Sequence, residues 1–203
     1  DDTSSWWIRV AQPVAGNGWG FFWLPRIGME VIVDFLGGDP DRPIVLGCVY
    51  NGANAPPYAL PGDKTKITLK SNSSPGGGGS NELRFEDQAG AEEVYLHAQK
   101  DWNTVVGASM SLSVGGSESD SIGGGRSTSV GADDSLAVGA NATRTIGANL
   151  TETVTATHTL TVGTTETNTI GTDQTNTIGT TQINTIGPAQ ITTIRPIRAP
   201  TVA

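Results

Sequence analysis

The sequence predicts an all-β protein in which a small barrel is followed by an intertwined homotrimeric, triple-stranded β-helix with an octad repeat. Three observations lead to this fold class. Every aromatic residue lies at or before Trp102 and every lysine at or before Lys100, so the chain divides into two regions of different composition. In the second region a β-branched residue recurs every eight positions, and polar residues alternate with apolar ones. A fixed period indicates a repeat architecture, and alternation of period two is typical of strands.

The octad repeat carries most of the fold prediction. Twelve Val or Ile residues follow one another at a spacing of eight, and ten of them are followed directly by Gly. Because eight is an even number, these residues share one face of an extended chain. We expect this octad series to form the core of the trimer, and its members are Val106, Val114, Ile122, Val130, Val138, Ile146, Val154, Val162, Ile170, Ile178, Ile186 and Ile194.

The opposite face of the same region is polar. From residue 105 to 193 almost every odd position holds Ser, Thr, Gly, Asn or Asp, whereas most other apolar residues stand at even positions. The apolar exceptions at odd positions are Val105, Ala137, Ile183, Ala189 and Ile191. The region is therefore predicted to be strand rather than helix or coil, with its even face inward and its Ser/Thr face outward.

An eight-residue unit requires several chains. One octad makes one short strand, with Gly beside the Val or Ile to permit a kink, and a single chain with one strand per octad cannot enclose a core. Three chains wound about one axis place three octads in a triangular layer and leave few long sheet edges unpaired. At a strand spacing of ~4.8 Å the twelve octads rise on the order of 60 Å.

The first hundred residues predict a small barrel and a collar. Short apolar runs separated by turn signals rich in Gly, Pro and Asp, without helical periodicity, favour a barrel of the oligonucleotide/oligosaccharide-binding (OB) type. Its expected strands are residues 6–12, 18–24, 29–36 and 42–50. The collar is expected to hold strands at residues 81–87 and 92–100, with inward side chains at Leu83, Phe85, Val94 and Leu96.

These predictions divide the chain into four parts. They are the barrel with a proline-rich connector at residues 1–62, the collar with a glycine-rich loop at 63–104, the octads of the triple-stranded β-helix at 105–194, and a tip at 195–203. Proline cannot donate to a strand ladder, so Pro196 and Pro200 end the octads. The last layer is expected to be a docking surface formed by Ile191, Ile194 and Ile197.

No catalytic residue, no cofactor and no enzymatic activity are predicted. The sequence has two histidines and lacks HExxH, GxSxG and paired-cysteine motifs. Cys48 lies in an apolar strand and is expected in the core. The aromatic clusters at residues 6–7 and 21–23 could bind bases or sugars on a barrel surface, but packing in the core and between chains is the favoured interpretation.

His158 is the weak candidate for a metal site. It stands at an even position, so three copies are expected to converge near the three-fold axis, where their imidazoles could hold an adventitious ion or bind water. Charged residues also occupy even positions and need partners if they are buried. The spacing allows Glu118 to pair with Arg126 and Arg144 with Glu152, unless these charges reach solvent at the corners.

Composition excludes several classes of protein. No run reaches the ~18 apolar residues of a membrane span, and a single cysteine excludes a disulfide scaffold. The net charge of −8 argues against nucleic acid as a partner. Since the first residue is Asp1 and no signal-peptide pattern is visible, we expect the sequence to be part of a longer chain.

Four segments together with the Val-Gly repeats resemble a known family. They are PRIGMEV at residues 25–31, GDPDRPIVLGCVYN at 38–51, PYALP at 57–61 and NELRFED at 81–87. They are similar to the C-terminal half of VgrG, the valine-glycine repeat spike of the bacterial type VI secretion system, which is itself similar to the central spike of contractile phage tails. The resemblance covers nearly the whole chain and implies an OB-type barrel followed by a trimeric β-helix.

The resemblance also implies function and partners. It implies a membrane-puncturing spike that delivers effectors, carries a PAAR-type cone on its tip, and joins the Hcp tube through a hub region that this sequence lacks. Such a spike stays in the bacterial cytoplasm before firing, then contacts a target membrane transiently and is secreted. The alternatives are a trimeric adhesin or receptor-binding fibre stalk, a flat ice-binding threonine array, and a wall or capsule hydrolase.

Overall fold

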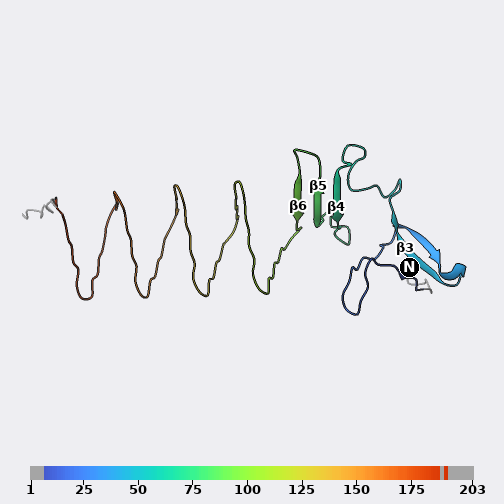
Figure 1. Cartoon of the computed structure of the whole chain (residues 1–203), viewed down its shortest axis with the longest axis horizontal. Coiled ribbons are helices and arrows are strands. Elements are labelled where there is room, and N and C mark those ends of the chain that lie inside the picture. Colours follow the sequence, from blue (N-terminus) through green and yellow to red (C-terminus); the bar gives the residue numbers. More distant parts are fainter. Residues whose placement is uncertain (1–6, 188–189, 192–203) are drawn as a thin grey trace, which may run out of the picture. The chain divides into compact units, whose positions relative to one another are not determined.

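The computed structural model describes residues 7–187 and 190–191, and its regular elements there are strands and one short 3-10 turn. The chain divides into two compact units between Ser121 and Ile122, and each is described by itself. Figure 1 shows the sheets of the first unit and the winding course of the second. Within the described ranges no helix is long and apolar enough to cross a membrane. The all-β prediction is therefore confirmed.

The first sheet has three strands. They are β1 (Arg9–Val10), β2 (Glu30–Phe35) and β3 (Pro43–Val49), in the spatial order β1-β3-β2. β1 runs parallel to β3, and β2 runs antiparallel to β3 with an irregular register between Ile32 and Val33. The turn η1 (Leu36–Gly38) joins β2 to β3 and requires a positive φ at Gly37 and Gly38.

Two of the four expected barrel strands are confirmed with nearly the predicted bounds, at 29–36 and 42–50. The first is shorter than expected, and its residue Trp6 lies outside the described residues. The strand expected at 18–24 is wrong, because that segment forms only an isolated bridge between Ala15 and Gly20. The Gln12 side chain satisfies the backbone of Trp23 instead, by donating to its carbonyl at 2.8 Å and accepting from its N–H at 3.1 Å.

The second sheet is antiparallel, and its strands β4 (Lys66–Lys70), β5 (Glu82–Glu86) and β6 (Glu93–His97) follow one another in space as in the sequence. β5 and β6 confirm the collar strands predicted at 81–87 and 92–100. Sequence reasoning missed β4. The segment Lys66–Lys70 alternates polar and apolar residues, which is typical of a strand, but five residues are too short a run for this pattern to stand out in the sequence.

The octad region bends once in every repeat. Ten two-residue bends, from 107–108 to 179–180, each begin directly after a member of the octad series. One of them is Thr155–Ala156, so the bend does not depend on Gly. No strand is assigned between residues 101 and 187, which are all exposed in the single chain. A strand ladder needs a hydrogen-bonded neighbour, and successive turns of one chain do not supply it.

Candidate trimer interface

The octad series has one environment throughout its described length. Its side chains, from Val106 to Ile186, are between 43% exposed (Ile146) and 52% exposed (Ile178). At odd positions of the same region, Val105 is 94% exposed and Ile183 is 82% exposed. The octad positions, each directly before a bend in the described range from Val106 to Ile178, are therefore the apolar positions that the chain partly covers by itself. The remaining half of each side chain is apolar surface that only another molecule can cover.

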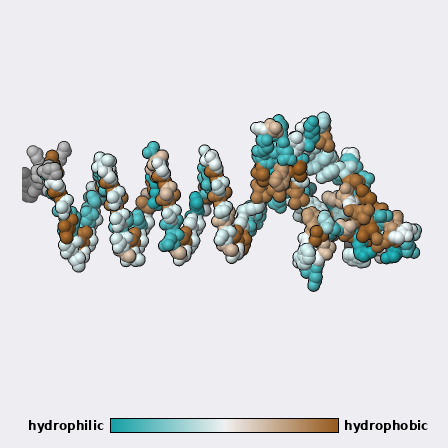
Figure 2. Space-filling view, in the orientation of Figure 1, coloured by the Kyte–Doolittle hydropathy of each residue, from teal (hydrophilic) through white to brown (hydrophobic). Residues whose placement is uncertain are grey.

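Apolar side chains between the bends are left even more open. Met110, Leu112, Leu136, Leu150 and Leu160 all stand at even positions and are all exposed in the single chain. Figure 2 shows hydrophobic residues recurring along this region, between hydrophilic ones. A monomer would leave an apolar stripe running through ten octads in water, and soluble proteins rarely tolerate so large a patch.

The collar sheet continues the same pattern. The strand register aligns Ile67, Phe85 and Val94 in one row across the three strands, and Leu69, Leu83 and Leu96 in a second row. Sequence analysis placed the β5 and β6 members of this apolar face inward. They do share one face, on which all of these side chains except the half-buried Leu83 are exposed in the single chain, whereas the chain's own connector lies against the opposite face.

The opposite, polar face is built around a buried carboxylate. Glu82 is 6% exposed and accepts hydrogen bonds from the Tyr58 hydroxyl and, at 2.9 Å, from the Thr68 hydroxyl. The Lys70 ammonium lies 3.3 Å from its second oxygen. Burial of the carboxylate acts to raise the pKa of Glu82, but the hydrogen bonds from Tyr58, Thr68 and Lys70 outweigh it and lower that pKa below its ordinary value.

Arg84 completes this network. Its guanidinium donates to the Glu93 carboxylate at 2.7 Å and to the Tyr58 hydroxyl at 2.9 Å, and these bonds raise the pKa of Arg84. It also stands 4.4 Å from the Tyr95 ring centroid, a cation–π distance. Its buried Nε atom has no hydrogen-bond partner within the chain.

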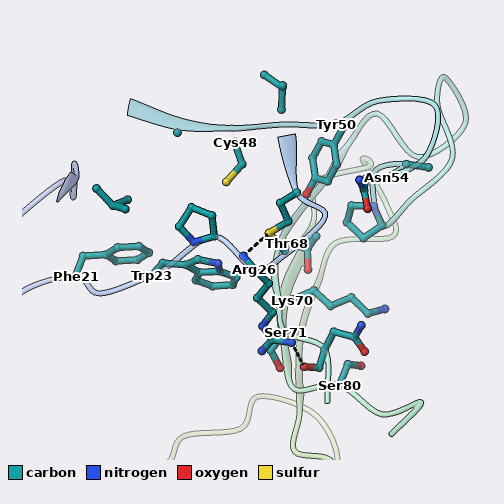
Figure 3. Close-up of a pocket in the computed structure, with 18 of the residues that line it drawn as sticks. Phe21, Trp23, Arg26, Cys48, Tyr50, Asn54, Thr68, Lys70, Ser71 and Ser80 are labelled. Carbon is teal, nitrogen blue, oxygen red and sulfur yellow. Dashed lines mark hydrogen bonds between the residues drawn. The ribbon is translucent and has the colours of Figure 1, made fainter. Parts of the chain in front are cut away.

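An aromatic-lined cleft of about 880 Å³ lies in the first unit, between the barrel segment and the collar strands (Figure 3). Phe21 and Trp23 stack on its wall with ring centroids 6.5 Å apart. Cys48 also lines the cleft and is exposed, so the expectation that it lies in the core is wrong.

The described residues contain no cluster of three or more His, Cys, Asp or Glu side chains that could hold a metal ion. The aromatic clusters likewise stay open in the single chain, with Trp7 and Phe22 both exposed.

His158 has a partner that sequence analysis did not foresee. Its Nε2 lies 3.8 Å from Oε1 of Glu152, across the bend at residues 155–156, and both side chains are more than half exposed. Within one chain Glu152 therefore faces His158 and not the predicted Arg144. The axial ion site at His158 and ion pairs between chains stay predictions. At the tip Ile191 is 91% exposed, whereas Ile194 and Ile197 lie outside the described residues.

Apolar side chains recur every eight residues, and a single chain covers only about half of each. These features define a class of β-protein whose fold is completed by further copies of the same chain. Residues 67–178 match the family model of the bacteriophage T4 gp5 C-terminal trimerisation domain, and the chain belongs to this family. Residues 1–50 match the OB domain of type VI secretion system and phage-baseplate injectors. The two matches confirm the predicted fold class and support a homotrimer.

Curated relatives confirm the resemblance found in the sequence. The chain is 58% identical over 103 residues to the type VI secretion system spike protein VgrG4b of Pseudomonas aeruginosa. It is 53% identical over 106 residues to the spike protein VgrG3 of Vibrio cholerae, and 54% identical over 106 residues to the actin cross-linking toxin VgrG1 of the same species. The aligned segments cover 51% to 52% of this chain but only 10% to 13% of these relatives.

Proposed function

We propose that the chain forms the needle-bearing part of a trimeric spike that punctures a target envelope and delivers effectors for a type VI secretion machine. The observation that carries this proposal is the uniform half-exposure of the octad series in a chain of the gp5 trimerisation family. The names of the relatives, which are spike proteins of that secretion system, point the same way.

The work of such a spike is mechanical. Twelve octads at ~4.8 Å per strand give a needle on the order of 60 Å, longer than the ~30 Å hydrocarbon core of a bilayer. Backbone hydrogen bonds between the chains would resist bending, and the outer face of Ser and Thr would not adhere to lipid. Aliphatic side chains would fill the axis.

The partners follow from the same proposal. A PAAR-type cone would dock on the distal layer that includes Ile191, and the Hcp tube would join through a hub region outside this sequence. The trimer would wait in the bacterial cytoplasm and then be exported with its effectors through transient contact with a membrane. We propose no nucleic acid partner and no bound cofactor, because the net charge is −8 and no ligand set is apparent in the sequence.

We also propose that this part of the protein is not catalytic. One relative is named an actin cross-linking toxin, but the matched segment is 10% of that protein. The adhesin alternative receives no support from the names of the relatives. Binding of the purified chain to target cells or glycans would favour it, and turnover of peptidoglycan would favour an enzyme.

The proposal is tested in a bacterium that carries the whole protein. Ile170→Asp places three like charges in one buried layer, and each is costly to desolvate. We expect the variant to abolish killing of neighbouring cells and release of the tube protein. The control Thr169→Asp changes the adjacent, outward position and should preserve both. Normal delivery by Ile170→Asp would refute a load-carrying needle.

A further inference from the structure

We propose that residues 51–63 are a rigid strap that locks the barrel sheet to the collar sheet, so that thrust passes between them through side-chain bonds. The role in thrust rests on the proposed function, whereas the lock itself does not. The connector between two domains is by default a flexible tether. In this chain it is fastened at both of its ends.

The upstream end of the strap is fixed to the entry of β2. The Asn51 side chain donates to the Glu30 carboxylate at 2.5 Å and accepts from the N–H groups of Ala53 and Asn54 at 2.9 and 2.7 Å. The Asn54 side chain then donates to the Gly28 carbonyl at 2.9 Å. These bonds shape a turn and hold it against the barrel sheet, so the strap leaves β3 in one direction.

The downstream end is fixed to the polar face of the collar. The Tyr58 hydroxyl donates to the buried Glu82 carboxylate and accepts from Arg84 at 2.9 Å, and both partners belong to β5. Three cations surround the Tyr58 ring: Lys66 Nζ at 4.9 Å from its centroid, Lys70 Nζ at 5.5 Å and Arg84 Cζ at 5.6 Å. Hydrogen bonds to charged groups are the stronger class, and a buried carboxylate that loses a donor is left poorly compensated.

A third hydrogen bond joins the segments that flank the two sheets. The Arg26 guanidinium, which precedes β2, donates to the carbonyl of Asn72, which follows β4, at 2.7 Å (Figure 3). Polar contacts at three places, made by Asn54, Tyr58 and Arg26 with partners far away in the sequence, thus connect the barrel, the strap and the collar.

Hydrogen exchange of the whole trimer tests the lock. Tyr58→Phe keeps the ring and its cations but removes both hydroxyl bonds, and Asn54→Ala removes the upstream hydrogen bond to the Gly28 carbonyl. We expect each to speed amide exchange at residues 52–63 by about tenfold or more, while the octads exchange as before. Tyr50→Phe, a hydroxyl loss at an exposed tyrosine just outside the strap, is the matched control. Unchanged exchange at 52–63 in both test variants would overturn the proposal.

Delivery assays then test whether the connection between barrel and collar is needed to transmit thrust. Native mass spectrometry first establishes that Tyr58→Phe is still a trimer. Faster exchange together with reduced killing of neighbouring cells supports a thrust-bearing strap. Faster exchange with full killing overturns the mechanical role, and it leaves the proposed function intact because the needle still delivers. Failure of the proposed function would instead appear in Ile170→Asp, which leaves the strap unaltered.

Discussion

Ile178 and Ile183 belong to one octad and differ in exposure: Ile178 is 52% exposed in its own chain, whereas Ile183 is 82% exposed. Their separation of five is odd, so the face assignment predicts that Ile178 points to the axis and Ile183 to solvent. The same residue type is thus predicted inside and outside the needle within a few residues. This arrangement offers a direct test of the face assignment.

Ile178→Thr should lower the melting temperature of the trimer by several degrees. It removes aliphatic surface and places a hydroxyl in the axial layer of all three chains, and each buried polar group without a partner costs about 1–3 kcal/mol. Ile183→Thr, the identical substitution on the outer face, should change the melting temperature little. Thermal unfolding followed by circular dichroism compares the two, and equal shifts would contradict the face assignment.

Folding and assembly of the octad region should coincide. Its apolar face is covered only when other copies are present, so the melting temperature should rise with protein concentration. Native mass spectrometry should find trimers, and dilution should produce unfolded monomers. A monodisperse monomer with a strong β-sheet signal would contradict the architecture.

The collar face should be as sensitive as the octads. Val94 is exposed in the single chain, yet Val94→Asp should prevent or weaken trimer formation, because the row that it shares with Ile67 and Phe85 is predicted to lie against other copies. Gln88→Asp introduces the same charge in the nearby turn and should be tolerated. The measurement is the trimer fraction by size-exclusion chromatography with light scattering.

Acid should weaken the collar through Glu82. The pKa of Glu82 is depressed in the folded chain, so its carboxylate contributes stability above its ordinary pKa of about 4.5, and that contribution disappears as the pH falls through the lower folded value. Denaturant titrations between pH 7 and pH 3 should therefore show a loss of stability in this acidic range. Glu82→Gln should flatten that dependence, whereas the exposed Glu92→Gln should leave it as in the wild type.

The repeat could be predicted from the sequence, whereas part of the barrel could not. Twelve residues at one spacing predict where the chain bends, and the bend at Thr155 follows the period even without Gly. The face that they share stays a prediction. By contrast, the backbone near Trp23 is satisfied by a side chain eleven residues away, a solution that local strand propensity does not reveal.

The polar network was also beyond the reach of sequence reasoning. Tyr58 and Glu82 are 24 residues apart, in a proline-rich connector and a strand, and only the folded chain brings them together. Alternation correctly gave the apolar side chains of β5 and β6 a common face. It could not show that the chain's own connector covers the other face and leaves the apolar one to further copies.

The bend after every eighth residue makes the length of the needle adjustable in fixed steps. Insertion or deletion of eight residues preserves both the bend position and the alternation of faces, and it changes the predicted rise by ~4.8 Å. Insertion of a single residue would instead transfer the following members of the octad series to the outside and the threonines of the odd positions to the axis. Whole octads are therefore the units by which this region can lengthen or shorten over evolutionary time.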